Sequence, residues 1–323
     1  MVRRAVIIGT GGYLPEKILH NADLPAHLET SDEWIAERTG IKQRHIAAEG
    51  EVTSAMGIKA GAQAIKNAGV SADTIDLVIV ATTTPDDTMP ATAAKIQHAL
   101  GANGAAFDVN AACSGFVYAM TIANNFIISG AASRVLVIGA ETYSRILDWN
   151  DRATCILFGD GAAAVLLDAQ SGTNANSDRG ILFSKIHSDG KFADLIKTTG
   201  GVSSTGNSGL FTMEGKEVFR HAVAKMPASV EEGLQSLDLP KNSIDWLAPH
   251  QANMRILRSV AQKLSIPEEK VISNVAQCAN TSAASIPLAL HQAASDGRLK
   301  NGQIIACPAL GAGLTWGCTI LRW

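Results

Sequence analysis

The sequence predicts an α/β protein whose two halves resemble each other. Short runs rich in β-branched residues alternate with longer Ala-rich segments along the whole chain, at residues 5–8, 77–80, 135–138 and 304–306 for example. This alternation is typical of buried strands layered against helices. The chain has 323 residues, of which 46% are hydrophobic and 18% charged, so it can bury a large core, as one big domain or two tightly packed halves.

Matching segments recur at a constant spacing along the chain. Residues 75–77 (Ile-Asp-Leu) lead into one strand candidate, and residues 244–246 (Ile-Asp-Trp) lead into another at an offset of 169 (75 to 244). The strand candidates at 135–137 and 304–306 repeat the same offset. Ordered matches of this kind indicate an internal duplication.

The border between the halves is predicted in a polar loop. A third, looser pair of segments, Phe-Gly-Asp-Gly at 158–161 and Leu-Gly-Ala-Gly at 310–313, opens an apolar strand in each half. Residues 170–180 are rich in Ser, Asn and Gly, a composition typical of loops. We therefore place the N-terminal half at residues 1–172 and the C-terminal half at residues 173–323.

The charge balance offers no general attraction for nucleic acid or anionic membranes. The 27 basic and 30 acidic residues give a formal net charge of −3. The apolar run at residues 5–8 is too short for a signal sequence, and no apolar stretch reaches the length of a membrane span. We expect a cytoplasmic protein that binds neither nucleic acid nor a membrane.

A short helix is predicted after the first strand. Thr30 and Glu33 have the spacing of a capping box, and Gly40 is suited to end the helix. Trp34 and Arg38 would then lie four residues apart on one helix face.

Cys113 is the candidate nucleophile. It follows a strand and precedes residues 116–129, which are apolar on nearly every side and therefore predict a buried helix that ends before Gly130. At the amino end of a helix, the dipole and the unpaired N–H groups favour the thiolate. Small neighbours leave room for a substrate chain. The five cysteines include no C-x-x-C pair, which favours free thiols in a reducing compartment, and four are interpreted as structural: Cys155, Cys278, Cys307 and Cys318.

A nucleophilic cysteine needs further groups that manage protons or charge. His250 follows the apolar run 246–249 and begins a polar cluster, His-Gln-Ala-Asn, at the carboxyl end of a strand, where ligand-binding groups of α/β proteins collect. Asn280 lies 167 residues after Cys113 (113 to 280), close to the duplication offset, so it is expected to face Cys113 across a pseudo-twofold axis. On their own, these two could equally be a turn histidine and a helix N-cap.

Together, the three motifs resemble the Cys-His-Asn triad of the β-ketoacyl-[acyl-carrier-protein] synthase III family. Cys113 lies in Ala-Ala-Cys-Ser-Gly-Phe, His250 in His-Gln-Ala-Asn and Asn280 in Asn-Thr-Ser-Ala-Ala-Ser. Elongating ketosynthases have a second His in place of Asn280, and thiolases have a second Cys. Plant-type polyketide synthases share the triad but are longer and lack the context of Trp34 and Arg152. The resemblance spans essentially the whole chain and includes residues 37–41, 151–154, 158–162 and 311–317.

The resemblance implies a fold and a reaction. The fold is thiolase-like, with two pseudo-symmetric halves that form a five-layered αβαβα sandwich. The reaction starts bacterial type II fatty acid synthesis: an acyl-CoA primer, expected to be acetyl-CoA, acylates Cys113, and malonyl-acyl-carrier protein then condenses with it. His250 and Asn280 stabilise the enolate formed by decarboxylation, and the backbone N–H groups of Cys113 and Gly313 form the oxyanion hole. No metal and no other cofactor is expected, and no His/Cys/Asp grouping has metal-ligand spacing.

The resemblance also implies binding residues and a homodimer. Trp34, Arg38 and Arg152 match the site for CoA, and Met89 matches a residue that closes the primer pocket of the partner subunit. Two departures stand out: Ala279 replaces a usual glycine, which either shifts Asn280 or reflects an ordinary φ, and Ala309-Leu310 replaces Gly-Phe in the acyl pocket. The expected contacts of the acidic carrier protein are Arg220, Gln251, Arg255, Arg258 and Lys263.

Other readings of the sequence are weaker. Glycines at 9, 11 and 12 follow the first strand, but no helix opens after them and no acidic residue stands at the distance that dinucleotide binding requires. The same motifs would also suit a ketosynthase III-like acyltransferase of secondary metabolism with another primer or acceptor. A non-catalytic acyl-binding scaffold is disfavoured because Cys113, His250 and Asn280 are all present.

Overall fold

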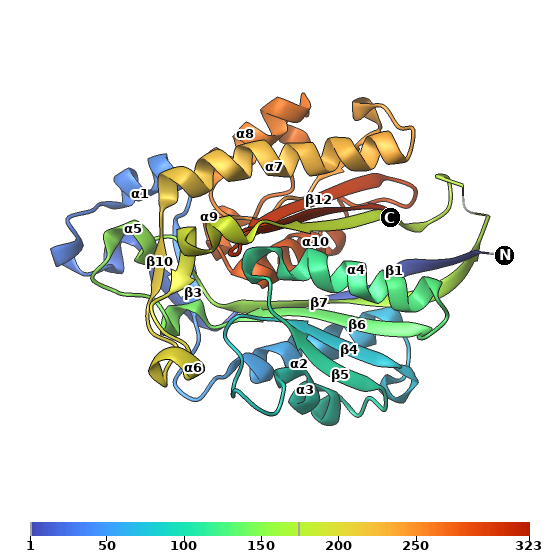
Figure 1. Cartoon of the computed structure of the whole chain (residues 1–323), viewed down its shortest axis with the longest axis horizontal. Coiled ribbons are helices and arrows are strands. Elements are labelled where there is room, and N and C mark those ends of the chain that lie inside the picture. Colours follow the sequence, from blue (N-terminus) through green and yellow to red (C-terminus); the bar gives the residue numbers. More distant parts are fainter. Residues whose placement is uncertain (1, 174) are drawn as a thin grey trace.

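The computed structural model describes residues 2–173 and 175–323, which form stacked layers of helices and sheets (Figure 1). The strand order in one main sheet is β1 (Val2–Tyr13), β7 (Gly161–Gly172), β6 (Arg134–Glu141), β4 (Leu77–Ala81) and β5 (Ala105–Val109). In this sheet β4 pairs in parallel with β5 and β6, while β7 runs antiparallel to both β6 and β1.

The second main sheet repeats this arrangement. Its strands, in order, are β8 (Gly180–Ser188), β13 (Thr315–Arg322), β12 (Ile304–Gly311) and β11 (Trp246–Leu247). β11 and β12 are parallel, whereas β13 is antiparallel to both β12 and β8. The orders β1-β7-β6-β4 and β8-β13-β12-β11 therefore correspond strand by strand, as an internal duplication predicts.

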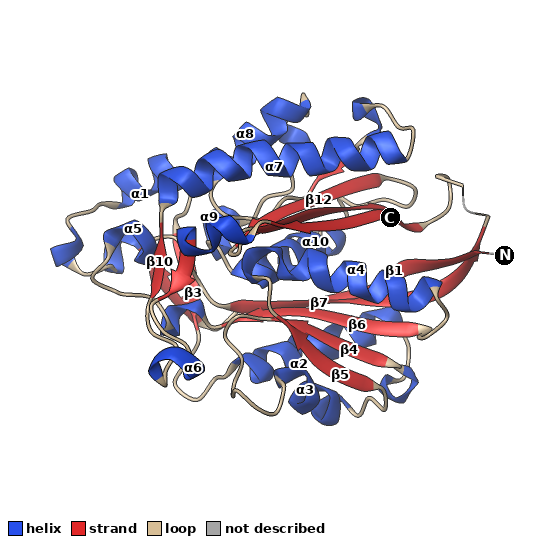
Figure 2. Cartoon of the chain, viewed as in Figure 1, coloured by secondary structure: helices blue, strands red, loops and turns tan. Residues whose placement is uncertain are grey.

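Helices cover both faces of each sheet, so the layers alternate helix, sheet, helix, sheet, helix (Figures 1 and 2). This order confirms the thiolase-like αβαβα fold. One outer layer packs on the first sheet and consists of α2 (Thr53–Ala68) and α3 (Thr92–Leu100). The middle layer consists of α4 (Gly115–Ile128) and α10 (Ser285–Ser295). The other outer layer consists of α7 (Gly215–Ser236), which packs on the second sheet, and α8 (Met254–Leu264), which packs on α7.

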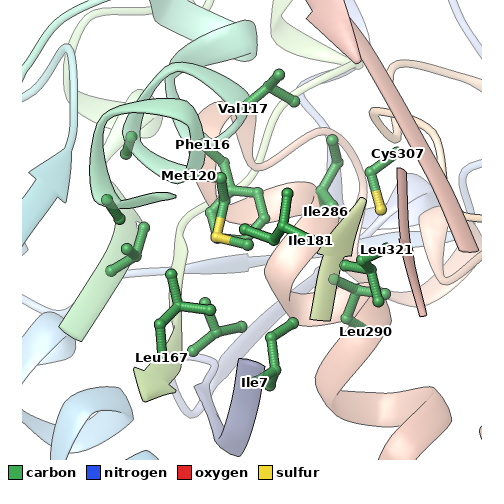
Figure 3. Close-up of a cluster of buried hydrophobic side chains, with 14 of the residues drawn as sticks. Ile7, Phe116, Val117, Met120, Leu167, Ile181, Ile286, Leu290, Cys307 and Leu321 are labelled. Atoms are coloured by element: carbon green, nitrogen blue, oxygen red, sulfur yellow. The ribbon is translucent and has the colours of Figure 1, made fainter. Parts of the chain in front are cut away.

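The central helices lie between the two sheets (Figure 1), and their apolar side chains belong to a buried cluster (Figure 3). Phe116 and Met120 of α4 and Ile286 and Leu290 of α10 are almost wholly inaccessible to solvent. Burial of each such side chain contributes about 1.5–3 kcal/mol, which stabilises the middle layer against both sheets. A short 3-10 turn precedes each helix, Ala112–Ser114 before α4 and Ser282–Ala284 before α10. Cys113 lies in the first turn, and Asn280 lies shortly before the second.

The predicted short helix forms, but with a different cap. Helix α1 (Asp32–Thr39) begins after Ser31, whose side chain accepts a hydrogen bond from the backbone N–H of Trp34 at 3.1 Å. The predicted capping box starting at Thr30 is therefore wrong by one residue, whereas the predicted stop at Gly40 is confirmed by its left-handed φ of 76°.

Short elements gather at the end of the sandwich where α1 lies (Figure 1). The short strands pair as β2 (Lys17–His20) with β3 (Gln43–Ile46) and as β9 (Ile196–Thr198) with β10 (Phe211–Met213). The remaining helices are α5 (Arg152–Cys155), α6 (Val202–Thr205) and α9 (Val275–Cys278).

Within residues 2–173 and 175–323, no helix combines the length and apolar character that a membrane span needs.

Candidate active site

A cavity of about 700 Å³ brings the three candidate catalytic residues together. Cys113 comes from the turn before α4, His250 follows β11, and Asn280 precedes the turn before α10. His250 and Asn280 are only 3% and 5% exposed, and Cys113 is half-buried. Exposed cationic side chains also line the cavity: Arg38, Arg152, Lys216 and Arg255. The cavity therefore leads from a basic mouth to a buried inner end.

Burial favours the uncharged thiol form of Cys113. Burial raises the pKa of the Cys113 thiol to about 12, and the charge of Glu141 acts in the same direction. The neighbouring Ser282 hydroxyl and Asn280 amide lower this pKa but do not offset burial. This direction is opposite to the thiolate that the helix start was expected to favour, because desolvation of the charge outweighs the hydrogen bonds that Cys113 receives.

His250 is a neutral imidazole held from two sides. Its backbone N–H donates to the carbonyl of Pro308 at 2.9 Å, and its ring Nδ1 lies 2.7 Å from the hydroxyl of Ser285. Burial lowers the pKa of His250 to about 3. The ring is therefore uncharged at neutral pH and can donate a hydrogen bond into the cavity, but it is a weak base.

Asn280 is fixed so that its amide NH₂ is the available end. Its Oδ1 accepts a hydrogen bond from the backbone N–H of Ser282 at 2.8 Å. Its backbone N–H donates to the carbonyl of Leu157 at 2.9 Å, and its carbonyl accepts from the backbone N–H of Gly159 at 3.0 Å. These two hydrogen bonds hold the residue in place. The side-chain amide then remains to interact with Cys113 and with a substrate.

The backbone around the site adopts strained conformations. Ala112 has a φ of 46°, Ala279 of 57° and Ser282 of 49°. The alternative of an ordinary φ at Ala279 is thus wrong: the residue occupies a conformation that favours glycine. Such conformations cost of order 1–3 kcal/mol each and persist only where the surrounding structure enforces them. Here they flank Cys113 and Asn280.

Glu141 is a buried residue of this region that the sequence interpretation missed. It lies at the end of β6, is 0% exposed, and accepts hydrogen bonds from the Thr84 hydroxyl at 2.6 Å and the Thr83 backbone N–H at 3.1 Å. Burial raises the pKa of its carboxyl group. The sequence contained a signal for this buried carboxylate. An acidic residue ends an apolar strand, and a Thr-rich segment at 82–84 can supply hydroxyl donors. The contact anchors the loop that leads to Met89, which is 81% exposed.

The predicted CoA-binding residues lie together at the cavity. The guanidinium carbon of Arg38 is 4.3 Å from the centre of a Trp34 ring, and that of Arg152 is 5.1 Å away. Arg152 also donates to the backbone carbonyl of Glu29 at 2.8 Å. A base sandwiched between Trp34 and Arg152 needs roughly 7 Å, two contacts of ~3.5 Å, so Arg152 has to move outward to admit one.

Gly313 lines a neighbouring cavity of about 460 Å³, together with Ala111, Ala112 and Thr315, and not the cavity that contains Cys113. Gly311 approaches the nucleophile more closely. A Cβ atom on Gly311 would lie 2.8 Å from the backbone nitrogen of Cys113. This glycine is therefore required for the approach of β12 to the nucleophile turn, a requirement that the sequence interpretation missed.

Gln251 is not a surface residue, which corrects its expected contact with the carrier protein. It is 0% exposed, its Nε2 donates to the carbonyls of Pro249 at 2.7 Å and Ile272 at 3.1 Å, and its Oε1 accepts from the backbone N–H of Asn274 at 3.1 Å. A side chain with all these partners inside the protein cannot also contact a docked protein. Its role is to tie together the segments around His250.

The remaining carrier-contact candidates are exposed and differ in their partners. Arg220 pairs with Glu217 at 2.6 Å, and Arg258 pairs with Glu268 at 3.0 Å. Arg255 lines the main cavity, where its guanidinium carbon lies 5.7 Å from the centre of the Phe219 ring. Lys263 is exposed near the end of α8.

Comparison with known proteins decides the family. The chain is 55% identical over its full length to a protein of Paramagnetospirillum magneticum (strain ATCC 700264 / AMB-1) described as "Beta-ketoacyl-[acyl-carrier-protein] synthase III", all of which it also covers. The chain belongs to the β-ketoacyl-[acyl-carrier-protein] synthase III family. Residues 107–190 match the family model "3-Oxoacyl-[acyl-carrier-protein (ACP)] synthase III", and residues 234–323 match its "C terminal" model.

Solved structures of a synthase III and of a priming β-ketosynthase share the fold. The 3-oxoacyl-(acyl carrier protein) synthase III from Pseudomonas aeruginosa PAO1 is 42% identical with a TM-score of 0.93, and the match covers 99% of this chain and 98% of that one. The priming β-ketosynthase of the R1128 polyketide pathway is 32% identical with a TM-score of 0.90, covering 99% and 97%. Among the described residues of our chain, no group of three or more His, Cys, Asp or Glu side chains is arranged to hold a metal ion.

Proposed function

We propose that Cys113, His250 and Asn280 carry out the two stages of the synthase III reaction in this chain. As a member of the family, the protein is an acyltransferase that initiates fatty acid synthesis by condensing an acyl-CoA primer with malonyl-acyl-carrier protein. The observation that carries the residue roles is that all three side chains line the buried inner part of one cavity.

In the first stage the sulfur of Cys113 attacks the thioester carbonyl of the primer. The Cys113 proton passes to the departing CoA sulfur, so the step creates no net charge in the buried site. The oxyanion of the tetrahedral intermediate needs donors, for which we propose the backbone N–H groups of Cys113 and Gly313, because the cavity that Gly313 lines also reaches Ala112, the residue before Cys113. Loss of one such donor typically costs ~3 kcal/mol.

In the second stage malonyl-acyl-carrier protein loses CO₂ and leaves an enolate. The enolate oxygen accepts hydrogen bonds from the Asn280 amide and from the ring N–H of His250, both uncharged donors on residues that are almost inaccessible to solvent. The enolate carbon attacks the acyl-Cys113 thioester, forming a carbon–carbon bond and breaking the bond to sulfur. The sulfur then takes up one proton from solvent, and the products are CO₂, CoA and a 3-ketoacyl-carrier protein.

The cavity mouth supports the proposed substrates. Trp34, Arg38 and Arg152 are proposed to bind the CoA nucleotide, since a flat ring and guanidinium groups suit a base and its phosphates. The exposed cations are proposed to contact the acidic carrier protein: Arg220, Arg255, Arg258 and Lys263.

The finer assignments concern the primer, the assembly and the compartment. We propose acetyl-CoA as the primer, and a cytoplasmic homodimer in which the exposed Met89 of one subunit closes the primer pocket of the other. A second candidate function, priming a secondary metabolic pathway, is suggested by the likeness to the R1128 priming ketosynthase, but that identity is lower, at 32%.

Substitutions of the triad separate the two stages. Cys113→Ala should abolish acylation from radiolabelled acetyl-CoA. Asn280→Ala and His250→Ala should still acquire the acetyl group but decarboxylate malonyl-carrier protein about 10²-fold more slowly, because each lacks one enolate donor. Ser229→Ala, which removes a buried hydroxyl bonded to the carbonyl of Met226, is the matched control. Normal decarboxylation by the Asn280 and His250 variants would contradict the assigned roles.

A further inference from the structure

The ring of His250 has a buried partner on the side away from the substrate. Its Nδ1 lies 2.7 Å from the hydroxyl oxygen of Ser285, the first residue of α10. The same oxygen is 3.3 Å from the backbone nitrogen of Gln251, whose N–H points at it. Ser285 and His250 are 1% and 3% exposed, so solvent does not compete for these contacts.

Counting hydrogens at this oxygen decides which ring nitrogen carries the proton. A backbone N–H can only donate, so Ser285 accepts from Gln251 and has its single hydroxyl proton left for Nδ1. If Nδ1 carried the ring proton instead, the Ser285 oxygen would accept from both N–H groups, and its own hydroxyl proton would have no acceptor among the described residues. A buried polar group without a partner costs about 1–3 kcal/mol. Burial also lowers the pKa of His250, so a ring protonated on both nitrogens is disfavoured.

We infer that Ser285 is a positioning residue that fixes the neutral His250 ring with its proton on Nε2, which faces the cavity. The inference rests on the proposed function and deepens it. In this tautomer Nε2–H is a donor for the enolate oxygen of the second stage. The same nitrogen has no lone pair free to accept the Cys113 proton, which is why the proton goes to the departing CoA sulfur in the first stage.

The buried Gln251 side chain holds the backbone of this arrangement. Its amide bridges the carbonyls of Pro249 and Ile272 and the N–H of Asn274. The backbone N–H of His250 is fixed separately on Pro308. With the backbone held, the hydroxyl of Ser285 is the group that selects between the two tautomers and keeps the ring turned toward the cavity.

The kinetic test removes and then restores the hydroxyl. Ser285→Ala should lower kcat for condensation about tenfold, less than the 10²–10³-fold effect of deleting a donor outright, because the ring remains but its tautomer is no longer fixed. Acylation of Cys113 by acetyl-CoA and the KM for malonyl-carrier protein should stay within about twofold, because the first stage forms no enolate and the weakly basic ring does not take the Cys113 proton in either tautomer. Ser285→Thr, which keeps a hydroxyl, should recover most of the lost kcat, and Ser229→Ala should behave as wild type.

The spectroscopic test reads the tautomer directly. In ¹⁵N NMR of protein with ring-labelled histidine, the signals that disappear in His250→Gln identify His250. They should show a protonated Nε2 and an unprotonated Nδ1 in the wild type, and a mixture in Ser285→Ala. Should Ser285→Ala fail to fold, the wild-type spectrum and the Ser285→Thr kinetics still test whether Ser285 fixes the tautomer of His250.

The outcomes separate this inference from the proposed function. A protonated Nδ1 in the wild type, or wild-type kcat in a folded Ser285→Ala variant, would overturn the role of Ser285 while leaving condensation intact. Failure of the wild-type protein to acylate Cys113 would refute the proposed function instead, whatever the tautomer of His250.

Discussion

The raised pKa of Cys113 predicts an unusual pH dependence for its alkylation. The thiolate is the reactive form, and its fraction grows tenfold per pH unit until the pH reaches the pKa. With a pKa of about 12 instead of the ordinary 9.0, the thiolate fraction at pH 8 is ~10⁻⁴ instead of ~10⁻¹. Iodoacetamide should therefore modify Cys113 about 10³-fold more slowly than an ordinary exposed thiol at this pH.

Intact mass spectrometry of timed samples between pH 6 and 10 measures this rate, and Cys113→Ser corrects for the other four cysteines, which are buried. The rate should rise about 100-fold from pH 7 to pH 9 without levelling off. Asn280→Ala should slow alkylation further, because the Asn280 amide lowers the pKa of Cys113 in the wild type. A plateau below pH 8 would show a stabilised thiolate and would refute the dominance of burial over the helix dipole.

Three further predictions concern residues around the site. Gln251→Ala should lower the free energy of unfolding by about 3 kcal/mol in urea denaturation, because it leaves buried carbonyls and an N–H without partners; an unchanged stability with a raised KM for the carrier protein would instead place Gln251 at the surface. Ala279→Gly should raise the stability by about 1 kcal/mol, since relief of the positive φ outweighs the greater flexibility of the unfolded chain, and a loss of stability would contradict the strain. Trp34→Ala should raise the KM for acetyl-CoA about tenfold, because base stacking is worth about 1–3 kcal/mol, but should not change the KM for acetyl-pantetheine, which has no base; equal effects on both would argue against a stacking role.

The sequence predicted those features that depend on the order of residues along the chain. The offset of 169 residues anticipated two sheets with corresponding strand orders. The apolar segment at 116–129 anticipated the buried α4, and the motifs around Cys113, His250 and Asn280 anticipated side chains that share one cavity. Each of these signals is local or periodic, and burial in the fold reinforces it. The border at 172/173 stays a prediction.

The features that sequence could not give depend on the three-dimensional surroundings. The pKa of Cys113 rises because burial desolvates the thiolate, which no motif records. Gln251 reads as one polar residue of a surface-like cluster, yet its amide is enclosed by segments far apart in the chain. Glu141 was overlooked because its hydroxyl partners come from the loop after a neighbouring strand. The φ of Ala279 shows that a substitution for glycine need not change the backbone conformation.

The covalent role of Cys113 is tested most directly by intact and peptide mass spectrometry of the full-length protein, first with acetyl-CoA and then with malonyl-carrier protein. An acetyl group should appear on the peptide that contains Cys113 and should disappear when malonyl-carrier protein is added, as acetoacetyl-carrier protein forms in equal amount. Acetylation at another residue, or an adduct at Cys113 that persists while product accumulates, would contradict the proposed mechanism.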